Sequence, residues 1–379
     1  MSDFSRRSFL GAAAAAAGAA AGAGAAEEPR PRVLLHGDGV SLSPAEYAAL
    51  LARLAQAPGI TPDEYGLGGS VAEHEAWFAR LLGKERALFM PTGTLANHLA
   101  LRALAGGRAR VVVQEVSHVY NDAGDSAQAL SGLSLVPLAP EQATFGRADV
   151  ERVLARTATA RVESRVAAVS IESPVRRLRG ATFDQGEMRA VSALCREKGI
   201  RLHLDGARLF VASAYSGLAP ADYAALFDTV YVSLWKCFGA PQGAVLAGPA
   251  SVLEGLHHAR RMFGGALWSF WPFAAVARHY AEGYVDRLRR AVAVSEDFLR
   301  AVAYAPAFTV ERVAGGTNVF RLRARLADAE AFRRRLAARG VDLGPGTAGA
   351  EGVVFPVQVN ETWNGTTGAA LAEAFARAV

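Results

Sequence analysis

Two stretches of sequence, His203-Leu204-Asp205-Gly206-Ala207-Arg208 and Tyr231-Val232-Ser233-Leu234-Trp235-Lys236, decide the fold of this 379-residue chain. In each, a short apolar run typical of a buried strand leads to a side chain that can carry a charge. Buried strands of this kind belong to parallel sheets, whose carboxyl ends form one edge where ligands bind. The two stretches therefore predict that Asp205 and Lys236 meet at one edge of a mostly parallel sheet.

Strand-like and helix-like stretches alternate on both sides of this pair. Helical patterns, such as those at 95–105 and 188–198, separate apolar runs at 87–90, 110–113, 166–171, 200–204, 230–234 and 243–247. This alternation predicts an α/β fold with a mostly parallel sheet that is covered by helices. From residue 286 the pattern changes to a long Ala/Arg-rich helix, a strand near 319–322, a helix at 328–339 and a strand at 353–359. We therefore predict a large domain over residues 27–285 and a small C-terminal α+β domain over residues 286–379.

Lys236 is the most informative of the three lysines in the chain. Lys84 lies in a polar turn and Lys198 at a helix C-terminus, and both positions suit a lysine with a structural role. Lys236 instead ends a buried strand among apolar and aromatic residues, where desolvation lowers the pKa of its ammonium. Such an amine is nucleophilic and suited to forming a Schiff base with a carbonyl. The alternative is a lysine whose long stem carries its amine out to solvent.

Three further positions suit an aromatic, phosphorylated cofactor. A carboxylate at Asp205 can keep a pyridine nitrogen protonated, which lets the ring accept electrons from a substrate α-carbon, although Asp-Gly after a strand is also typical of a turn. Pro91-Thr92-Gly93-Thr94-Leu95-Ala96-Asn97 opens a helix whose N–H groups suit a phosphate, although threonine is also an ordinary helix cap. His118, which follows another strand, could stack on an aromatic ring or be structural.

Together these elements resemble the threonine aldolase / β-eliminating lyase family of fold-type I enzymes, which use pyridoxal 5'-phosphate (PLP). The matching elements are Tyr65-Gly66, Gly83-Lys84-Glu85, residues 91–97, His118, Glu172, residues 205–208 and Lys236 with Gly239-Ala240-Pro241. The resemblance implies that Lys236 binds PLP covalently, that Asp205 meets the pyridine nitrogen and that His118 stacks on the ring. It also implies that Gly93 and Thr94 bind the phosphate, that Arg208 contacts the cofactor or a substrate carboxylate, and that the protein is a homodimer or homotetramer.

The chain departs from this family on the substrate side. The loop after Glu172 reads Ser173-Pro174-Val175-Arg176-Arg177, where aldolases usually carry Asn-Thr-His-Asn. Phe355 stands where an arginine typically holds the α-carboxylate of the substrate, so that a charge-assisted pair is lost. We expect Arg176 or Arg177 to restore this contact. From their size, we also expect Trp235, Trp268 and Phe355 to favour a substrate side chain larger and more apolar than that of threonine.

The predicted function is a retro-aldol cleavage of a β-hydroxy-α-amino acid into glycine and an aldehyde. His118 or a bound water is the expected base, because a proton acceptor must reach the β-hydroxyl. Two alternatives remain open. One is another PLP-dependent reaction of an amino acid, namely β-elimination, racemisation or transamination. The other is a non-catalytic exported binding protein with the same fold.

The N-terminus predicts export. Ser5-Arg6-Arg7-Ser8-Phe9-Leu10 and the Ala/Gly-rich run after it have the layout of a twin-arginine signal over residues 1–26, which would deliver the protein to the periplasm. The alternative is an alanine-rich leader or a weak lipid-surface helix. The net charge of +5 is scattered, so we expect neither a nucleic-acid partner nor, after export, a membrane partner. We predict no metal site, and interpret Cys195 and Cys237 as structural thiols.

Overall fold

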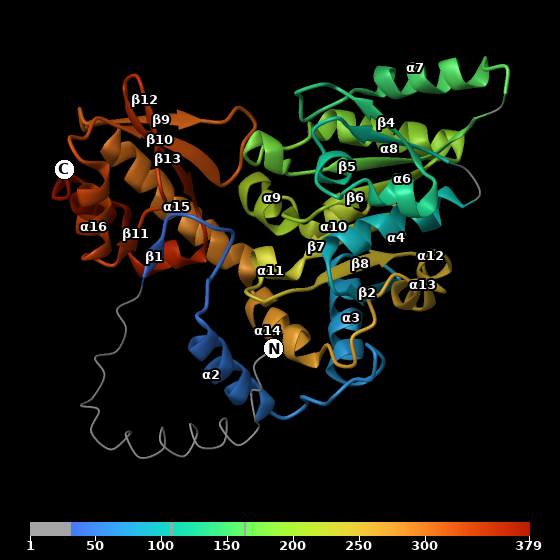
Figure 1. The fold of residues 1–379 in the computed structure, drawn as a ribbon, viewed down its shortest axis with the longest axis horizontal. Coiled ribbons are helices and arrows are strands. Elements are labelled where there is room, and N and C mark those ends of the chain that lie inside the picture. Colours follow the sequence, from blue (N-terminus) through green and yellow to red (C-terminus); the bar gives the residue numbers. More distant parts are fainter. Residues whose placement is uncertain (1–31, 107–108, 163) are drawn as a thin grey trace, which may run out of the picture.

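The computed structural model of the chain describes residues 32–106, 109–162 and 164–379. The predicted signal over residues 1–26 lies outside them. Figure 1 shows two parts side by side, a larger one built around a central sheet and a smaller one that contains the C-terminus. Within the described residues, no helix combines the length and the apolar character needed to span a bilayer.

A seven-stranded sheet forms the centre of the larger part. Its strand order is β2-β8-β7-β6-β5-β3-β4, and only β8 runs antiparallel to its neighbours. The predicted mostly parallel sheet is thereby confirmed. The strands are β2 (Arg86–Met90), β3 (Arg110–Gln114), β4 (Ser134–Leu138), β5 (Val166–Glu172), β6 (Arg201–Asp205), β7 (Thr229–Ser233) and β8 (Ala244–Gly248).

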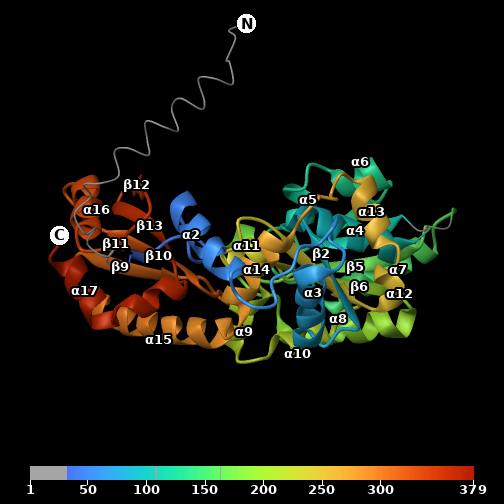
Figure 2. The same cartoon turned by 90° about the horizontal axis from the view of Figure 1, so that it is seen from below.

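Helices cover both faces of this sheet, which explains why every residue of β5 is buried. Figure 2 shows α4 (Gly93–Ala105) and α8 (Gln185–Lys198) on opposite sides of it. The other helices of the larger part are α2 (Pro44–Ala55), α3 (Gly69–Leu81), α5 (His118–Asn121), α6 (Ser126–Ser131), α7 (Arg147–Ala158), α9 (Leu209–Ser216), α10 (Pro220–Ala224), α11 (Leu234–Cys237), α12 (Ala250–Leu253), α13 (Leu256–Met262) and α14 (Trp271–Ala281), together with the 3-10 turn η1 (Arg176–Leu178).

The smaller part is built around a four-stranded antiparallel sheet of order β12-β13-β10-β9. Its strands are β9 (Phe308–Arg312), β10 (Val319–Ala324), β12 (Thr347–Gly349) and β13 (Gly352–Gln358), and its helical elements are α15 (Tyr284–Val302), α16 (Ala329–Ala337), α17 (Gly368–Ala376) and the 3-10 turn η2 (Glu361–Gly365). The predicted boundary between residues 285 and 286 falls in the first turn of α15. In addition, β1 (Val33–Leu34) pairs in parallel with β11 (Val341–Asp342), so the start of the described chain joins the smaller part.

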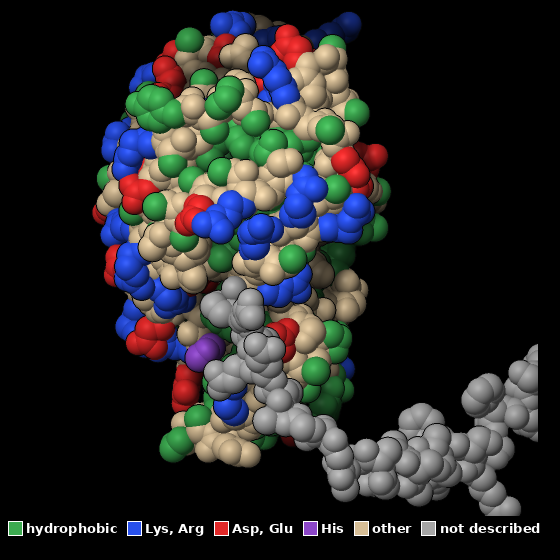
Figure 3. All heavy atoms as spheres, turned by 90° about the vertical axis from the view of Figure 1, so that its left-hand side faces the viewer, with side chains coloured by type: hydrophobic (Ala, Val, Ile, Leu, Met, Phe, Trp, Pro, Cys, Tyr) green, Lys and Arg blue, Asp and Glu red, His purple; other side chains and the backbone are tan. Residues whose placement is uncertain are grey.

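The outer face of the smaller part carries basic side chains interspersed with acidic and apolar ones (Figure 3). Ion pairs within this part of the chain balance many of these charges, as in Arg312–Glu296 and Arg323–Glu311, both at 2.5 Å. On this face the charges are mixed and are not gathered in one basic patch.

Candidate active site

A cavity of about 130 Å³ lies where the parallel strands of the large sheet end. Its wall includes all six predicted site residues, Gly93, Thr94, His118, Asp205, Arg208 and Lys236. They come from four segments, at the carboxyl ends of β2, β3, β6 and β7. Asn97, Glu172, Arg176, Tyr231 and Trp235 complete much of the remaining wall. The structure therefore brings the predicted residues together in one place.

Asp205 is held in a buried polar network. Its Oδ2 accepts a hydrogen bond from Nδ2 of Asn97 at 2.5 Å, and its Oδ1 accepts one from the backbone N–H of Ala207 at 3.1 Å. Oδ1 of Asn97 lies 2.9 Å from Nε2 of His203, whose Nδ1 lies 2.8 Å from Oγ1 of Thr229. Burial lowers the pKa of His203 to about 4, so its ring is neutral. Asn97 thus fixes one oxygen of Asp205 in place, and His203 and Thr229 lie behind it.

The amine of Lys236 is also buried, with 9% of the residue exposed. Its Nζ makes no hydrogen bond or ion pair with the described residues and lies 5.3 Å from the centre of the Trp235 ring. Burial, and then the positive charge of Arg208, lowers the pKa of Lys236. Both effects favour the neutral amine, which is the nucleophilic form.

The start of α4 lies against Tyr231. A Cβ atom on Gly93 would lie only 1.9 Å from the hydroxyl oxygen of Tyr231, so glycine is required by this close approach. Thr92 caps the helix, because its hydroxyl accepts a hydrogen bond from the N–H of Leu95 at 3.1 Å. The capping role considered for this motif is therefore present, and the N-terminus of α4 still faces the cavity through Gly93 and Thr94.

His118 is positioned by Glu172. Its backbone N–H donates to Oε2 of Glu172 at 2.5 Å, and the N–H of Arg176 donates to Oε1 at 2.9 Å. Burial and the nearby charge of Asp205 raise the pKa of Glu172 to about 7. Burial lowers the pKa of His118, and among the described residues nothing hydrogen-bonds to its buried Nδ1. His118 therefore lines the cavity, while its Nδ1 is shielded from solvent and has no hydrogen-bond partner among the described residues.

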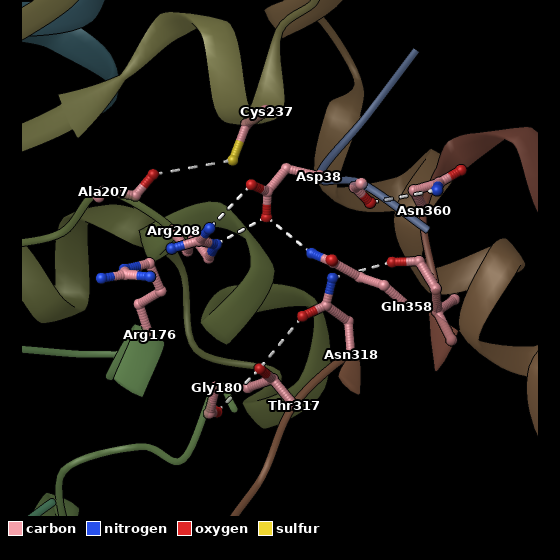
Figure 4. Close-up of polar contacts among 12 residues, drawn as sticks. Asp38, Arg176, Gly180, Ala207, Arg208, Cys237, Thr317, Asn318, Gln358 and Asn360 are labelled. Carbon is pink, nitrogen blue, oxygen red and sulfur yellow. Dashed lines mark hydrogen bonds and ion pairs between the residues drawn. The ribbon is translucent and has the colours of Figure 1, made fainter. Parts of the chain in front are cut away.

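Arg208 is paired with an aspartate from the N-terminal segment (Figure 4). Its Nε and Nη2 lie 2.6 and 2.8 Å from the two carboxylate oxygens of Asp38, and each side chain is about one-eighth exposed. Nε2 of Gln358, on β13, donates to the same Asp38 at 2.7 Å. An aspartate near the start of the described chain thus holds Arg208, although the two residues are distant in sequence.

The two arginines of the loop after Glu172 occupy different places. Arg176 lines the cavity, and its Nη2 lies 2.5 Å from Oδ2 of Asp122. Arg177 is not part of the cavity wall and grips Asp122 with Nε and Nη2 at 3.1 and 2.8 Å. The side chains of Arg177 and Arg176, in this order of effect, hold the pKa of Asp122 near about 2. Of the two residues that we expected to contact a carboxylate, only Arg176 is placed to do so.

The three aromatic residues expected around the substrate are separated in space. Trp235 is half exposed and lines the cavity. Trp268 is outside the cavity wall, with its ring 5.0 Å from that of Tyr65 in an edge-to-face contact. Phe355 is fully buried in the core of the smaller part, 6.2 Å from the ring of Phe332. The expectation that Phe355 shapes a substrate pocket is therefore wrong.

These residues fit PLP. A buried amine without a partner is available to a carbonyl, a fixed carboxylate to a pyridine nitrogen, and the start of a 13-residue helix to a phosphate. The sequence singled out Lys236 and Asp205 but gave no role to Tyr231, His203 or Asn97. The available signals were Tyr231 inside β7 and His203 inside β6, because each interrupts a run of aliphatic residues.

Comparisons with known proteins agree with this site. The model of the family described as Beta-eliminating lyase matches residues 48–325, which is more than half of the chain. An alanine racemase from Cochliobolus carbonum is 32% identical over 55% of this chain and 53% of its own length, and a low-specificity L-threonine aldolase from Candida albicans is 31% identical over 56% and 57%. The chain thus spans about half the length of the curated relatives it matches.

A solved structure covers far more of the chain. A candidate L-allo-threonine aldolase from Listeria monocytogenes superposes with a TM-score of 0.74 and 26% identity, over 92% of this chain and 96% of its own. The similarity therefore includes the smaller part as well as the large sheet. The chain belongs to the beta-eliminating lyase family, within the fold-type I architecture of PLP-dependent enzymes.

Proposed function

We propose that this chain is a PLP-dependent aldehyde-lyase that cleaves a β-hydroxy-α-amino acid into glycine and an aldehyde. One observation carries the proposal: Lys236, Asp205 and His118 line a single cavity. Bound PLP supplies an electron sink that is conjugated with the substrate nitrogen. The threonine aldolases among the relatives support this choice of reaction.

Each residue has a defined task in this proposal. Lys236 holds the cofactor through its amine, whose lowered pKa favours the neutral form. Asp205, fixed by Asn97 and Ala207, keeps a proton on the pyridine nitrogen. His118 stacks on the ring, and His118 or a bound water accepts the proton of the β-hydroxyl, because burial lowers the pKa of the imidazole and favours its neutral form. Glu172 fixes the backbone of His118.

The substrate proposed for this site bears a β-substituent larger than the methyl group of threonine. Trp235 lines both the cavity and a second hollow of about 420 Å³, whose wall also includes Tyr47, Pro241 and Phe273. A mainly apolar hollow that shares Trp235 with the cavity wall suits an aromatic or long aliphatic group. Turnover of threonine that is much faster than turnover of its phenyl-bearing analogue would contradict this substrate assignment.

The reaction is tested by product analysis with matched cofactor controls. Purified protein is titrated with PLP, and the visible absorption band is compared with that of Lys236→Ala. Glycine and aldehyde are then measured with several β-hydroxy-α-amino acids. Equal amounts of glycine and aldehyde from wild type, and none from Lys236→Ala, are expected. PLP binding without either product would refute the lyase assignment.

A second candidate is racemisation, which the alanine racemase relative favours. It uses the same Lys236 and Asp205 but exchanges the α-proton and leaves the β-substituent in place. Solvent deuterium exchange at the α-carbon, with inversion and no aldehyde, would identify it. The non-catalytic alternative gains little support, because the cofactor residues are complete.

Export and self-association are also part of the proposal. The twin-arginine pattern supports transport to the periplasm, and replacing Arg6-Arg7 by two lysines is expected to retain the protein in the cytoplasm in a fractionation experiment. Membership of the family supports a homodimer or homotetramer. Light scattering of the purified protein measures the assembly, and a monomer at micromolar concentration would contradict it.

A further inference from the structure

The charges around the cavity indicate how the acid group of the substrate is held. This inference rests on the proposed function, because it concerns an amino acid bound at the same site. If Lys236 and Asp205 serve the cofactor, two cations in the cavity wall remain for a carboxylate, Arg208 and Arg176. The two differ in how far their charges are already balanced.

The charge of Arg208 is already balanced. Asp38 binds it through two short contacts, of 2.6 and 2.8 Å, in a setting where both side chains are close to 90% buried. Nε2 of Gln358 donates to Oδ1 of Asp38 at 2.7 Å, the same oxygen that Nε of Arg208 contacts. A second carboxylate at this guanidinium would face the negative charge of Asp38 at close range, and displacing Asp38 would leave it buried without its partner.

The charge of Arg176 is only partly balanced. Arg176 and Arg177 share the single carboxylate of Asp122, so this cluster of three side chains carries one excess positive charge. Arg177 occupies both oxygens of Asp122 with two nitrogens, whereas Arg176 contacts it through Nη2 alone. Nε and Nη1 of Arg176 have no hydrogen-bond partner among the described residues. A planar guanidinium with free N–H groups is suited to a two-point contact with a carboxylate.

The backbone of Arg176 is fixed at the cavity. Its N–H donates to Oε1 of Glu172 at 2.9 Å, while Oε2 of Glu172 accepts from the N–H of His118. Both oxygens of Glu172 are thus engaged by backbone groups. Arg176 and Arg208 line the same cavity, and Figure 4 shows Arg208 held by Asp38.

We infer that Arg176 is the residue that binds the α-carboxylate of the substrate, whereas Arg208 serves as one half of a neutral pair with Asp38. This makes the loop after β5, and not the C-terminal strand β13, the element that selects substrates with a free acid group. The site then discriminates an amino acid from its amide through a single side chain.

Glycine binding without turnover tests this inference. The PLP-loaded protein is titrated with glycine and, separately, with glycinamide, and the change in the visible band gives the affinity. Arg176→Ala is expected to weaken glycine binding by about tenfold to a hundredfold, since a hydrogen bond to a charged group is lost, and to leave glycinamide binding within about twofold. Arg176→Lys, which keeps the charge but loses the planar donor pair, is expected to lie between them.

Arg179→Ala is the matched control. Arg179 belongs to the same loop, is exposed and lies outside the cavity wall. Its replacement by alanine therefore removes an equal positive charge without removing a contact to the substrate. Little change in glycine binding is expected for it. Equal losses in Arg176→Ala and Arg179→Ala, or equal losses for glycine and glycinamide in Arg176→Ala, would overturn the inference. Glycine binding that depends on Arg176, in a protein that forms no aldehyde, would support it while refuting the lyase proposal.

Discussion

The network behind Asp205 gives the sharpest prediction for the cofactor site. Replacing Asn97 by alanine removes the amide that donates to Oδ2 of Asp205 at 2.5 Å and faces Nε2 of His203 at 2.9 Å. Asn97 is 2% exposed and His203 is fully buried, so water cannot easily replace either contact. Asp205 would keep only the 3.1 Å contact from the N–H of Ala207.

The magnitude follows from the two contacts that are lost. A hydrogen bond to a charged group contributes about 1.5–3 kcal/mol, and a buried donor left without a partner costs about 1–3 kcal/mol. Because the two contacts share one network, their losses overlap, and we expect the free energy of unfolding of the cofactor-free protein to fall by about 2–4 kcal/mol. An aspartate with one anchor fewer should also bind PLP about tenfold more weakly, which corresponds to about 1.4 kcal/mol.

Two measurements separate stability from cofactor binding. Urea unfolding of the cofactor-free protein gives the first quantity, and titration with PLP, followed by absorbance, gives the second. Thr229→Val is the control, because it removes the partner of Nδ1 of His203 at the other end of the hydrogen-bond network and does not remove a contact of Asp205. It should destabilise the fold while preserving PLP affinity. If Asn97→Ala also preserves PLP affinity, the network does not position Asp205 for the cofactor.

Three other substitutions test separate parts of the structure. Gly93→Ala should lower PLP affinity and cost about 1–3 kcal/mol of stability, because its Cβ would overlap the Tyr231 hydroxyl. The control Gly349→Ala, whose Cβ meets only an ordinary contact at 3.5 Å, should leave PLP affinity and stability unchanged, and equal effects in the two variants would contradict the prediction. Phe355→Ala should lower the free energy of unfolding in urea by about 3–5 kcal/mol but keep the visible band of the cofactor, since Phe355 is a core residue. Loss of the band would indicate that Phe355 does contribute to the substrate site. Burial raises the pKa of Glu172 from 4.5 to about 7, so protonated Glu172 stabilises the fold fully below about pH 4.5, and this stabilisation is lost as the pH rises through about 7. Glu172→Gln should therefore flatten the decline of the unfolding free energy over this pH range. An unchanged slope of unfolding free energy against pH in the variant would contradict this assignment to Glu172.

The cofactor side of the site could be predicted from the sequence because it depends on strand ends. Parallel strands place their carboxyl ends at one edge, so Asp205 after β6 and Lys236 after β7 had to meet once the strands were recognised. The same rule gathers His118 after β3 and Gly93 after β2. No pairing needed to be known in detail, because residues that follow neighbouring strands share this edge whatever the exact register.

The fate of Phe355 shows where alignment with a family fails and local periodicity would have succeeded. Along β13, Phe355 and Val357 are fully buried while Pro356 between them is exposed. Alternate residues of a strand point to opposite faces, so the pattern places Phe355 on the core side of the sheet. A residue that replaces a functional arginine need not keep its direction, because an apolar ring at this position gains more from burial in the core than from contact with a wet cavity.

The substrate side could not be predicted in the same way, because it is assembled from segments that no single element connects. Asp38 lies in the N-terminal segment, Arg208 after β6 and Gln358 at the end of β13. The pairing of β1 with β11 and the hydrogen bond from the N–H of Gln358 to the carbonyl of Leu35 hold the N-terminal segment beside β13. The pairing of Arg208 with Asp38 decides whether its charge is free, and sequence patterns contain no measure of that. A family match through Arg208 therefore identifies a cation at the site but not its partner. Because Asp38 forms an ion pair with Arg208, the excess positive charge at the cavity resides with Arg176, in the loop where this chain departs from its family.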